Sequence, residues 1–99
     1  MANLPEGMNP ALTSQFLKIQ QAFVAGLAQR MRDIEGAKDQ QARYAALHRL
    51  AGAAGGYGFD ELSTIAHSTM VAMDSRSPCN LDVKLASLKV TVASIMHAY

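Results

Sequence analysis

The chain has 99 residues, of which 49% are hydrophobic and 17% are charged, so its composition is that of one globular domain and not of a disordered segment. Its 9 basic and 8 acidic residues leave a formal net charge of +1, which gives no electrostatic reason to expect nucleic acid as a partner. A mean hydropathy of +0.03 without a long apolar run excludes a membrane span, and a single cysteine without a signal-like start predicts a reduced, cytoplasmic protein.

Helix-breaking residues divide the chain into four helical segments within one domain over residues 9–99, after a flexible segment at residues 1–8. The expected helices cover about 10–35, 39–54, 60–74 and 81–98. Alanine is abundant and tryptophan is absent, which favours helices over strands. Short connections between four helices predict an all-α fold, an antiparallel up-and-down four-helix bundle with room for a short extra N-terminal turn.

The first expected helix begins with Asn9 as N-cap and Pro10 at the first helical position, and it stops at Gly36. Its apolar residues form one stripe at steps of three, four or seven: Leu12, Phe16, Ile19, Phe23, Leu27 and Ile34. A second strip beside it holds Leu17, Val24, Ala28 and Met31. Two interpretations stay open, a wide core face or an exposed docking patch formed by Leu17, Val24 and Met31.

The later helices have weaker boundary signals. The second begins near Asp39 and ends in the glycine cluster at 55–58, and Asp60 is a plausible N-cap for the third. Residues 74–78 and Cys79 are expected in a loop, with Asn80 capping the last helix. The seam of that helix repeats at steps of 4, 3, 4, 3 and 4 through Leu81, Leu85, Leu88, Val92, Ile95 and Tyr99.

His48 lies on the solvent side of the second helix. Successive helical residues turn by about 100°, which places His48 roughly 160° from the core stripe of Ala46, Leu50 and Ala54. Exposed faces usually carry long polar side chains, whereas the residues around His48 are mostly small or neutral: Gln41, Tyr44, Ala45, Ala51, Gly52 and Gly55. Gly52 in a helix interior costs about 1 kcal/mol relative to Ala. It indicates either close access to the imidazole or the start of fraying toward the glycine cluster.

The residues from His48 to Phe59 resemble the signature of histidine-containing phosphotransfer (HPt) domains. That pattern has a histidine, an apolar residue two positions on, a glycine four on, small residues after it and another glycine about ten on. Here these are His48, Leu50, Gly52, Ala53 with Ala54, and Gly58, followed by Leu62 at the start of the next helix.

The resemblance implies a phosphoryl carrier of a multistep phosphorelay, not a kinase, and the chain has no ATP-binding motif. His48 would accept a phosphoryl group from the aspartate of a receiver domain and pass it to another receiver. Gly52 would keep access to His48 clear, and Gln41, Tyr44, Ala45, Ala51 and Gly55 would contact the receiver. The expected partners are receiver domains of response regulators or of hybrid histidine kinases, which supply the aspartate and the Mg²⁺. We expect a monomer that binds no cofactor or metal of its own, and we expect neither nucleic acid nor a membrane as a partner.

The sequence departs from the family at Ala51, where many members carry a lysine three residues after the histidine. Arg49 is the basic residue nearby, and it either supports the phosphoryl oxygens or leaves that task to the partner. Two alternatives therefore stay open, a degenerate HPt-like domain that binds without accepting phosphate and an unrelated helical interaction module. His67, His97 and Cys79 have no spacing that indicates a metal site or a nucleophile.

Overall fold

A computed structural model describes the backbone of residues 10–74 and 78–99, and the side chains of residues 14–74 and 80–99. The elements are α1 (Pro10–Ala25), α2 (Leu27–Glu35), α3 (Gln40–Gly56), α4 (Asp60–Met73) and α5 (Pro78–Ala98). All regular structure in these ranges is helical, which confirms the prediction of an all-α fold class. The predicted segment 1–8 and the Asn9 cap lie outside the described residues.

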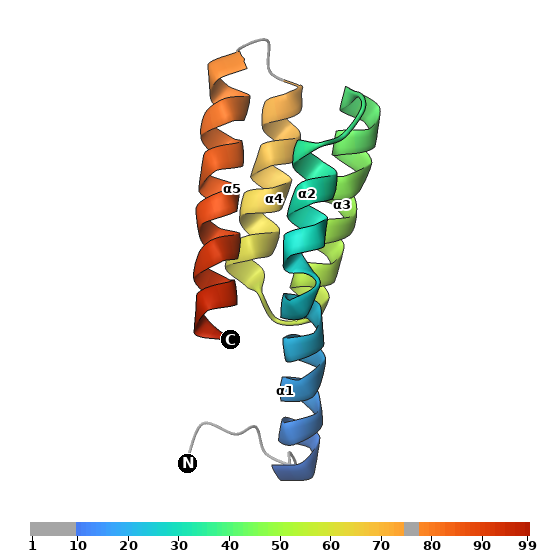
Figure 1. Cartoon of the computed structure of the whole chain (residues 1–99), viewed down its shortest axis with the longest axis vertical. Coiled ribbons are helices and arrows are strands. Elements are labelled where there is room, and N and C mark those ends of the chain that lie inside the picture. Colours follow the sequence, from blue (N-terminus) through green and yellow to red (C-terminus); the bar gives the residue numbers. More distant parts are fainter. Residues whose placement is uncertain (1–9, 75–77) are drawn as a thin grey trace.

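The first expected helix is interrupted at Gly26, so 10–35 is two helices instead of one. The Gly26 N–H donates to the Phe23 carbonyl three residues back at 3.0 Å, instead of four residues back as in a regular α-helix. Glycine has a low helix propensity, which makes this the natural position for the break. The chain keeps its direction across the break, and α1 continues the line of α2 (Figure 1).

Helices α2 to α5 enclose the core. Helix α3 packs on α4 and α4 on α5, while α2 contacts both α3 and α5, so each of the four touches two others. The chain reverses between successive members of this group (Figure 1). The large apolar side chains that are completely buried come from all four helices: Leu27, Ile34, Leu47, Leu50, Leu62 and Leu88. These residues follow the predicted periodicity, because each lies on the inward stripe of its own helix.

Much of α1 extends past the ends of α3 and α5 (Figure 1). Phe16 and Ile19, which were expected in the core stripe, are therefore 44% and 47% exposed. Leu17 is also exposed, at 47%, but Val24 and Met31 are buried at 6% each. The interpretation of Val24 and Met31 as an exposed docking patch is wrong, because α2 and the end of α1 turn that strip inward against the other helices.

The connection from α2 to α3 agrees with its sequence signals. Gly36 is the C-cap of α2, with its N–H donating to the Arg32 carbonyl at 2.8 Å. Asp39 is the N-cap of α3, and its carboxylate accepts from the Ala42 N–H at 2.7 Å. Arg43 on α3 reaches back across the turn and donates to the Ile34 carbonyl at 3.0 Å. Hydrogen bonds therefore hold this connection at the end of α2, at the start of α3 and between the two helices.

Replacing Asp39 by alanine should lower the free energy of unfolding by about 1 kcal/mol, because one backbone N–H of the first turn loses its acceptor. Urea unfolding followed by circular dichroism measures this change. Asp33→Ala, which alters an exposed carboxylate in the last turn of α2 that accepts only from the Gln29 side chain, is the matched control and should have a smaller effect. Equal losses in the two variants would contradict the capping role.

Two later helix starts differ from the prediction. Phe59, not Asp60, occupies the N-cap position of α4, and Asp60 and Glu61 lie in its first turn, where the helix dipole favours negative charge. Helix α5 begins at Pro78, so Cys79 and Asn80 are inside the helix and not in a loop and a cap. Proline lacks an N–H and suits a first helical turn, which explains the earlier start.

Candidate functional site

The exposed face of α3 brings together most of the residues that were singled out around the histidine. His48, Arg49, Gly52, Gln41 and Tyr44 are exposed, and Ala45 and Ala51 are half-buried. Helix α3 turns this face outward because Ala46, Leu47, Leu50 and Ala54 occupy the core on its opposite side. The predicted solvent exposure of His48 is confirmed.

Gly52 lies one helical turn after His48 and faces open space. A Cβ atom built on Gly52 would meet no atom of another residue within 4 Å, apart from the backbone of its own helix and its chain neighbours. Packing inside the chain therefore does not require glycine at this position. Gly56, the last residue of α3, is equally open. The access interpretation of Gly52 gains support, since helix α3 continues through it to Gly56 and does not end there.

Gly55 has a different environment, because it faces α4. A Cβ there would approach the Ser63 Oγ at 3.4 Å. The same hydroxyl donates to the Ala51 carbonyl at 2.8 Å, which ties α4 to the turn of α3 that follows His48. Ser63 was not among the residues singled out from the sequence. Only the packing of α3 on α4 identifies it, since a serine that follows the cap of a helix carries no signal of its own.

Arg49 and Ala51 flank His48 on different sides of α3. On a helix the residue one position on is turned by about 100°, and the residue three positions on by about 60° in the opposite sense. Arg49 is fully on the exposed surface, whereas Ala51 is half-buried and packs against the core cluster. Arg49 and Ala51, which stands where the family carries its lysine, are therefore on opposite sides of the imidazole.

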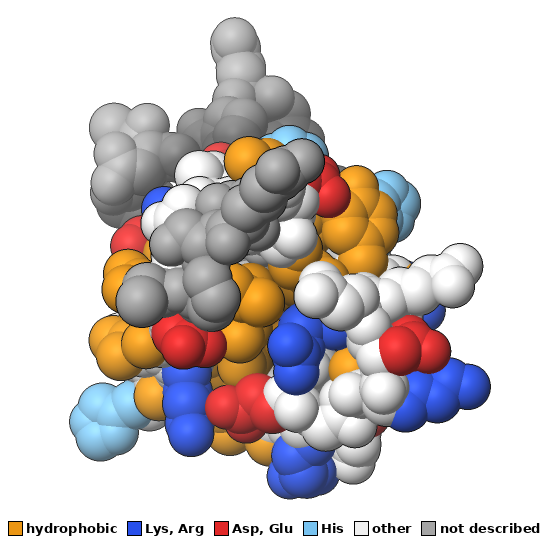
Figure 2. Space-filling view, turned by 90° about the horizontal axis from the view of Figure 1, so that it is seen from above, with side chains coloured by type: hydrophobic (Ala, Val, Ile, Leu, Met, Phe, Trp, Pro, Cys, Tyr) orange, Lys and Arg blue, Asp and Glu red, His pale blue; other side chains and the backbone are white. Residues whose placement is uncertain are grey.

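Among the residues singled out around His48, Arg49 alone has a charged side chain. Figure 2 views the molecule from above, and on that end Lys and Arg side chains are interspersed with Asp and Glu side chains. A shallow hollow of about 300 Å³ lies toward the start of α3, lined by Lys38, Asp39, Gln41, Ala42 and Ala45. The small side chain of Ala45 lies on its His48 side, and the charged Lys38 and Asp39 lie farther away, before the start of the helix.

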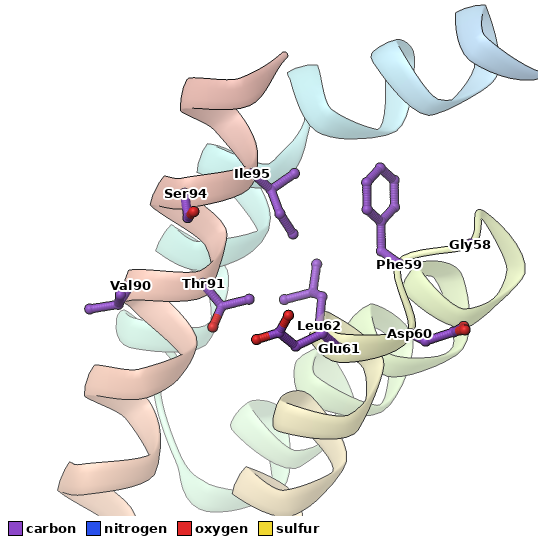
Figure 3. A pocket seen from close by; sticks show the side chains of 9 residues that line it. All are labelled: Gly58, Phe59, Asp60, Glu61, Leu62, Val90, Thr91, Ser94 and Ile95. Carbon is purple, nitrogen blue, oxygen red and sulfur yellow. The ribbon is translucent and has the colours of Figure 1, made fainter.

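A second cleft lies between the first turn of α4 and the end of α5, with a volume of about 510 Å³ (Figure 3). The side chains of Phe59, Leu62 and Ile95 point into it, and the Glu61 carboxylate lies toward Thr91, while Asp60 points away. Within the described ranges, no group of three histidine, cysteine or carboxylate side chains could hold a metal ion. The lining of the cleft combines apolar side chains with the hydroxyl groups of Thr91 and Ser94 and the carboxylates of Asp60 and Glu61, and it contains no histidine.

His67 and His97 are exposed on α4 and α5, as expected from their positions off the core stripes. Cys79 lies in the first turn of α5, but its side chain is outside the described residues. None of the described helices is both long and apolar enough to cross a membrane. Comparisons of the chain with protein-family models, curated proteins and solved structures found no match.

Proposed function

We propose that this chain is a histidine phosphotransfer protein of a multistep phosphorelay, with His48 as the phosphoryl acceptor. The observation that carries the proposal is an exposed imidazole on a continuous helix, with an open glycine one turn later. A partner's active site can approach such a histidine closely and exclude water around it. The resemblance of residues 48–59 to the HPt signature is the reason why we assign phosphoryl transfer to this geometry.

The transfer step follows from the chemistry of the two groups. A ring nitrogen of neutral His48 attacks the phosphorus of a receiver's aspartyl phosphate with its lone pair. The bond from phosphorus to the carboxylate oxygen breaks, the carboxylate leaves, and a P–N bond forms on the imidazole. Mg²⁺ on the receiver neutralises the phosphoryl oxygens during in-line transfer. Attack by the aspartate of another receiver reverses the step and frees His48.

The architecture that suits this role is an antiparallel up-and-down four-helix bundle made of α2, α3, α4 and α5. Support comes from the ring of contacts among these helices and from the alternating chain direction in Figure 1. Such a bundle presents α3 as one rigid edge, so His48 and Gly52 keep a fixed relation to each other. The proposed receiver contacts on this edge are Gln41, Tyr44, Ala45, Ala51 and Gly55.

Phosphoryl transfer from a panel of phosphorylated receiver domains tests the proposal. The expected product carries label that is lost in acid and retained in base, as a phosphohistidine requires. Receiver binding without label would favour a degenerate HPt-like domain, for which the half-buried Ala51 in place of the family's lysine is the motivating observation. Absence of both label and binding across the panel would favour an unrelated helical module.

Arg49→Ala should slow transfer about two- to fivefold, because an exposed charged contact with the phosphoryl oxygens contributes up to about 1 kcal/mol. Rates from rapid-quench labelling measure the effect. Arg32→Ala, which removes an exposed arginine on α2, is the matched control and should leave the rate unchanged. An unchanged rate in Arg49→Ala would assign the charge stabilisation to the partner alone.

A further inference from the structure

The projecting half of α1 carries an apolar face that the rest of the described chain leaves largely uncovered. Phe16, Leu17 and Ile19 are 44%, 47% and 47% exposed. They continue the same stripe that is buried farther along at Phe23 and Val24. Residues 14–20 therefore present a core-like surface beyond the end of the helical body (Figure 1).

This projection is held in a defined direction. The Gln20 Nε2 donates to the Tyr57 carbonyl at 2.8 Å, between α1 and the turn that follows α3. The Phe23 ring stacks near Tyr57 and Phe59, with centroids 5.1 Å and 5.5 Å apart. Gly58 has a φ of 86°, and a Cβ there would meet Gln20 and the Phe16 ring. Helix α1 is thus anchored at its C-terminal half, so its exposed face is preorganised for binding.

A groove lies next to this apolar face. Its walls are Gln21, Val24 and Ala25 of α1, Met96 of α5 and Tyr99 directly after α5, and its volume is about 300 Å³. Met96 and Tyr99 remain 40% and 48% exposed. Leu17 precedes Gln21 by four residues and Val24 by seven, so it lies on the same side of α1 as the groove. The exposed side chains of Phe16, Leu17 and Ile19 form a ridge, and this ridge and the groove are therefore adjacent in one chain.

Charge favours a second copy as the occupant. Lys18 is the one charged residue in the sequence from Pro10 to Ala25. It lies about 160° around the helix from Phe16 and about 100° from each of Leu17 and Ile19, on the side opposite the centre of the apolar face. Two copies of this face can meet without bringing like charges together. A strongly charged partner would find no complementary group on it.

The exposed area is also close to what a dimer needs. The five side chains Phe16, Leu17, Ile19, Met96 and Tyr99 are each 40–48% exposed. Together they expose on the order of 400 Å² per copy. Two copies would bury about 800 Å² from these side chains alone, and the surrounding glutamines bring the contact toward the roughly 1,200 Å² of a small specific interface.

We propose that the chain forms a symmetric dimer through α1, with Leu17 of each copy seated in the groove between α1 and α5 of the other. An isologous contact of this kind closes on itself and stops at two copies. This proposal replaces the expectation of a monomer, and it does not depend on phosphotransfer. In the structure much of α1 extends beyond the body and leaves its apolar side chains exposed.

Sedimentation equilibrium of the purified chain tests the dimer over about 1 to 200 µM, the range in which a small interface associates. The expected mass rises toward twice the 10.6 kDa of one chain. Leu17→Glu on the ridge and Met96→Glu beside the groove should each hold the mass at that of one chain. Val83→Glu, at a 61% exposed valine near the other end of α5, is the matched control and should still dimerise.

Circular dichroism checks that each variant keeps the helical content of the parent chain. A parent chain that remains monomeric at the highest concentration would overturn the proposal. Dimers of unchanged strength in a folded Leu17→Glu variant would also overturn it, as would equal loss of the dimer in Val83→Glu. None of these outcomes bears on whether His48 accepts a phosphoryl group, so the two proposals fail separately.

Discussion

Replacing His48 by glutamine should abolish the phosphorylated product while leaving the fold unchanged. Glutamine is similar in size and polar, but its amide nitrogen has no lone pair available for attack on phosphorus. His48 is exposed and lies outside the hydrophobic core cluster, so its loss removes no core packing. Label from a phosphorylated receiver measures the first effect, and thermal unfolding followed by circular dichroism measures the second.

His67→Gln is the matched control, because His67 is also exposed on a helix but belongs to α4. It should accept label at the rate of the parent chain, since His48 is intact. Label that persists in His48→Gln, or that disappears in His67→Gln, would move the acceptor to another residue. A large fall in the melting temperature of His48→Gln would contradict the exposed position of this side chain.

Gly52→Gln should slow transfer about tenfold or more, because the new side chain lies one turn from His48 on the approach path of the receiver. The same change should leave stability unchanged or raise it by up to about 1 kcal/mol, since glycine is unfavourable inside a helix. No atom of another residue obstructs a Cβ at this position. Rate and stability are thus expected to move in opposite directions, which a general loss of structure cannot produce.

Gly56→Gln is the control for this variant. Gly56 is equally open and belongs to the same helix, but it lies two turns from His48 instead of one. It should change the transfer rate much less than Gly52→Gln does. Equal slowing in both variants would mean that the receiver covers the whole end of α3, and unchanged rates in both would remove the access argument for Gly52.

Local sequence signals located several helix boundaries because the chemistry that ends or starts a helix is itself local. The second helix was expected to begin near Asp39, and Asp39 is the N-cap of α3, where it accepts from the Ala42 N–H. Gly36 ends α2 as expected. The starts of α4 and α5 were less accurate. Asp60 and Asn80 have the right side chains for an N-cap, yet Phe59 takes that position in α4 and Pro78 begins α5. A polar residue near a helix start can serve in the first turn equally well, so residue type alone does not distinguish the two positions.

The candidate site was also predictable only in part from the sequence. Helical periodicity placed His48 and Gly52 on the exposed side of α3, and both are exposed. Periodicity could not reveal Ser63, whose bond to the Ala51 carbonyl depends on how α4 packs against α3. It also treated Leu17, Val24 and Met31 as one strip, although Leu17 is exposed and the other two are buried. A helical wheel gives the direction of a side chain, but it does not show whether another helix is present in that direction.

The sequence by itself determined the all-helical fold class, the inward stripes of the helices and the outward direction of His48. These properties follow from residue propensity and from the turn of about 100° per residue, which need no knowledge of neighbours. The tertiary structure decided where α1 loses its partners, which glycines face open space and which face α4, and where ridge and groove meet. Those properties depend on how far each helix extends alongside the next, and that distance is set by packing between segments far apart in the chain.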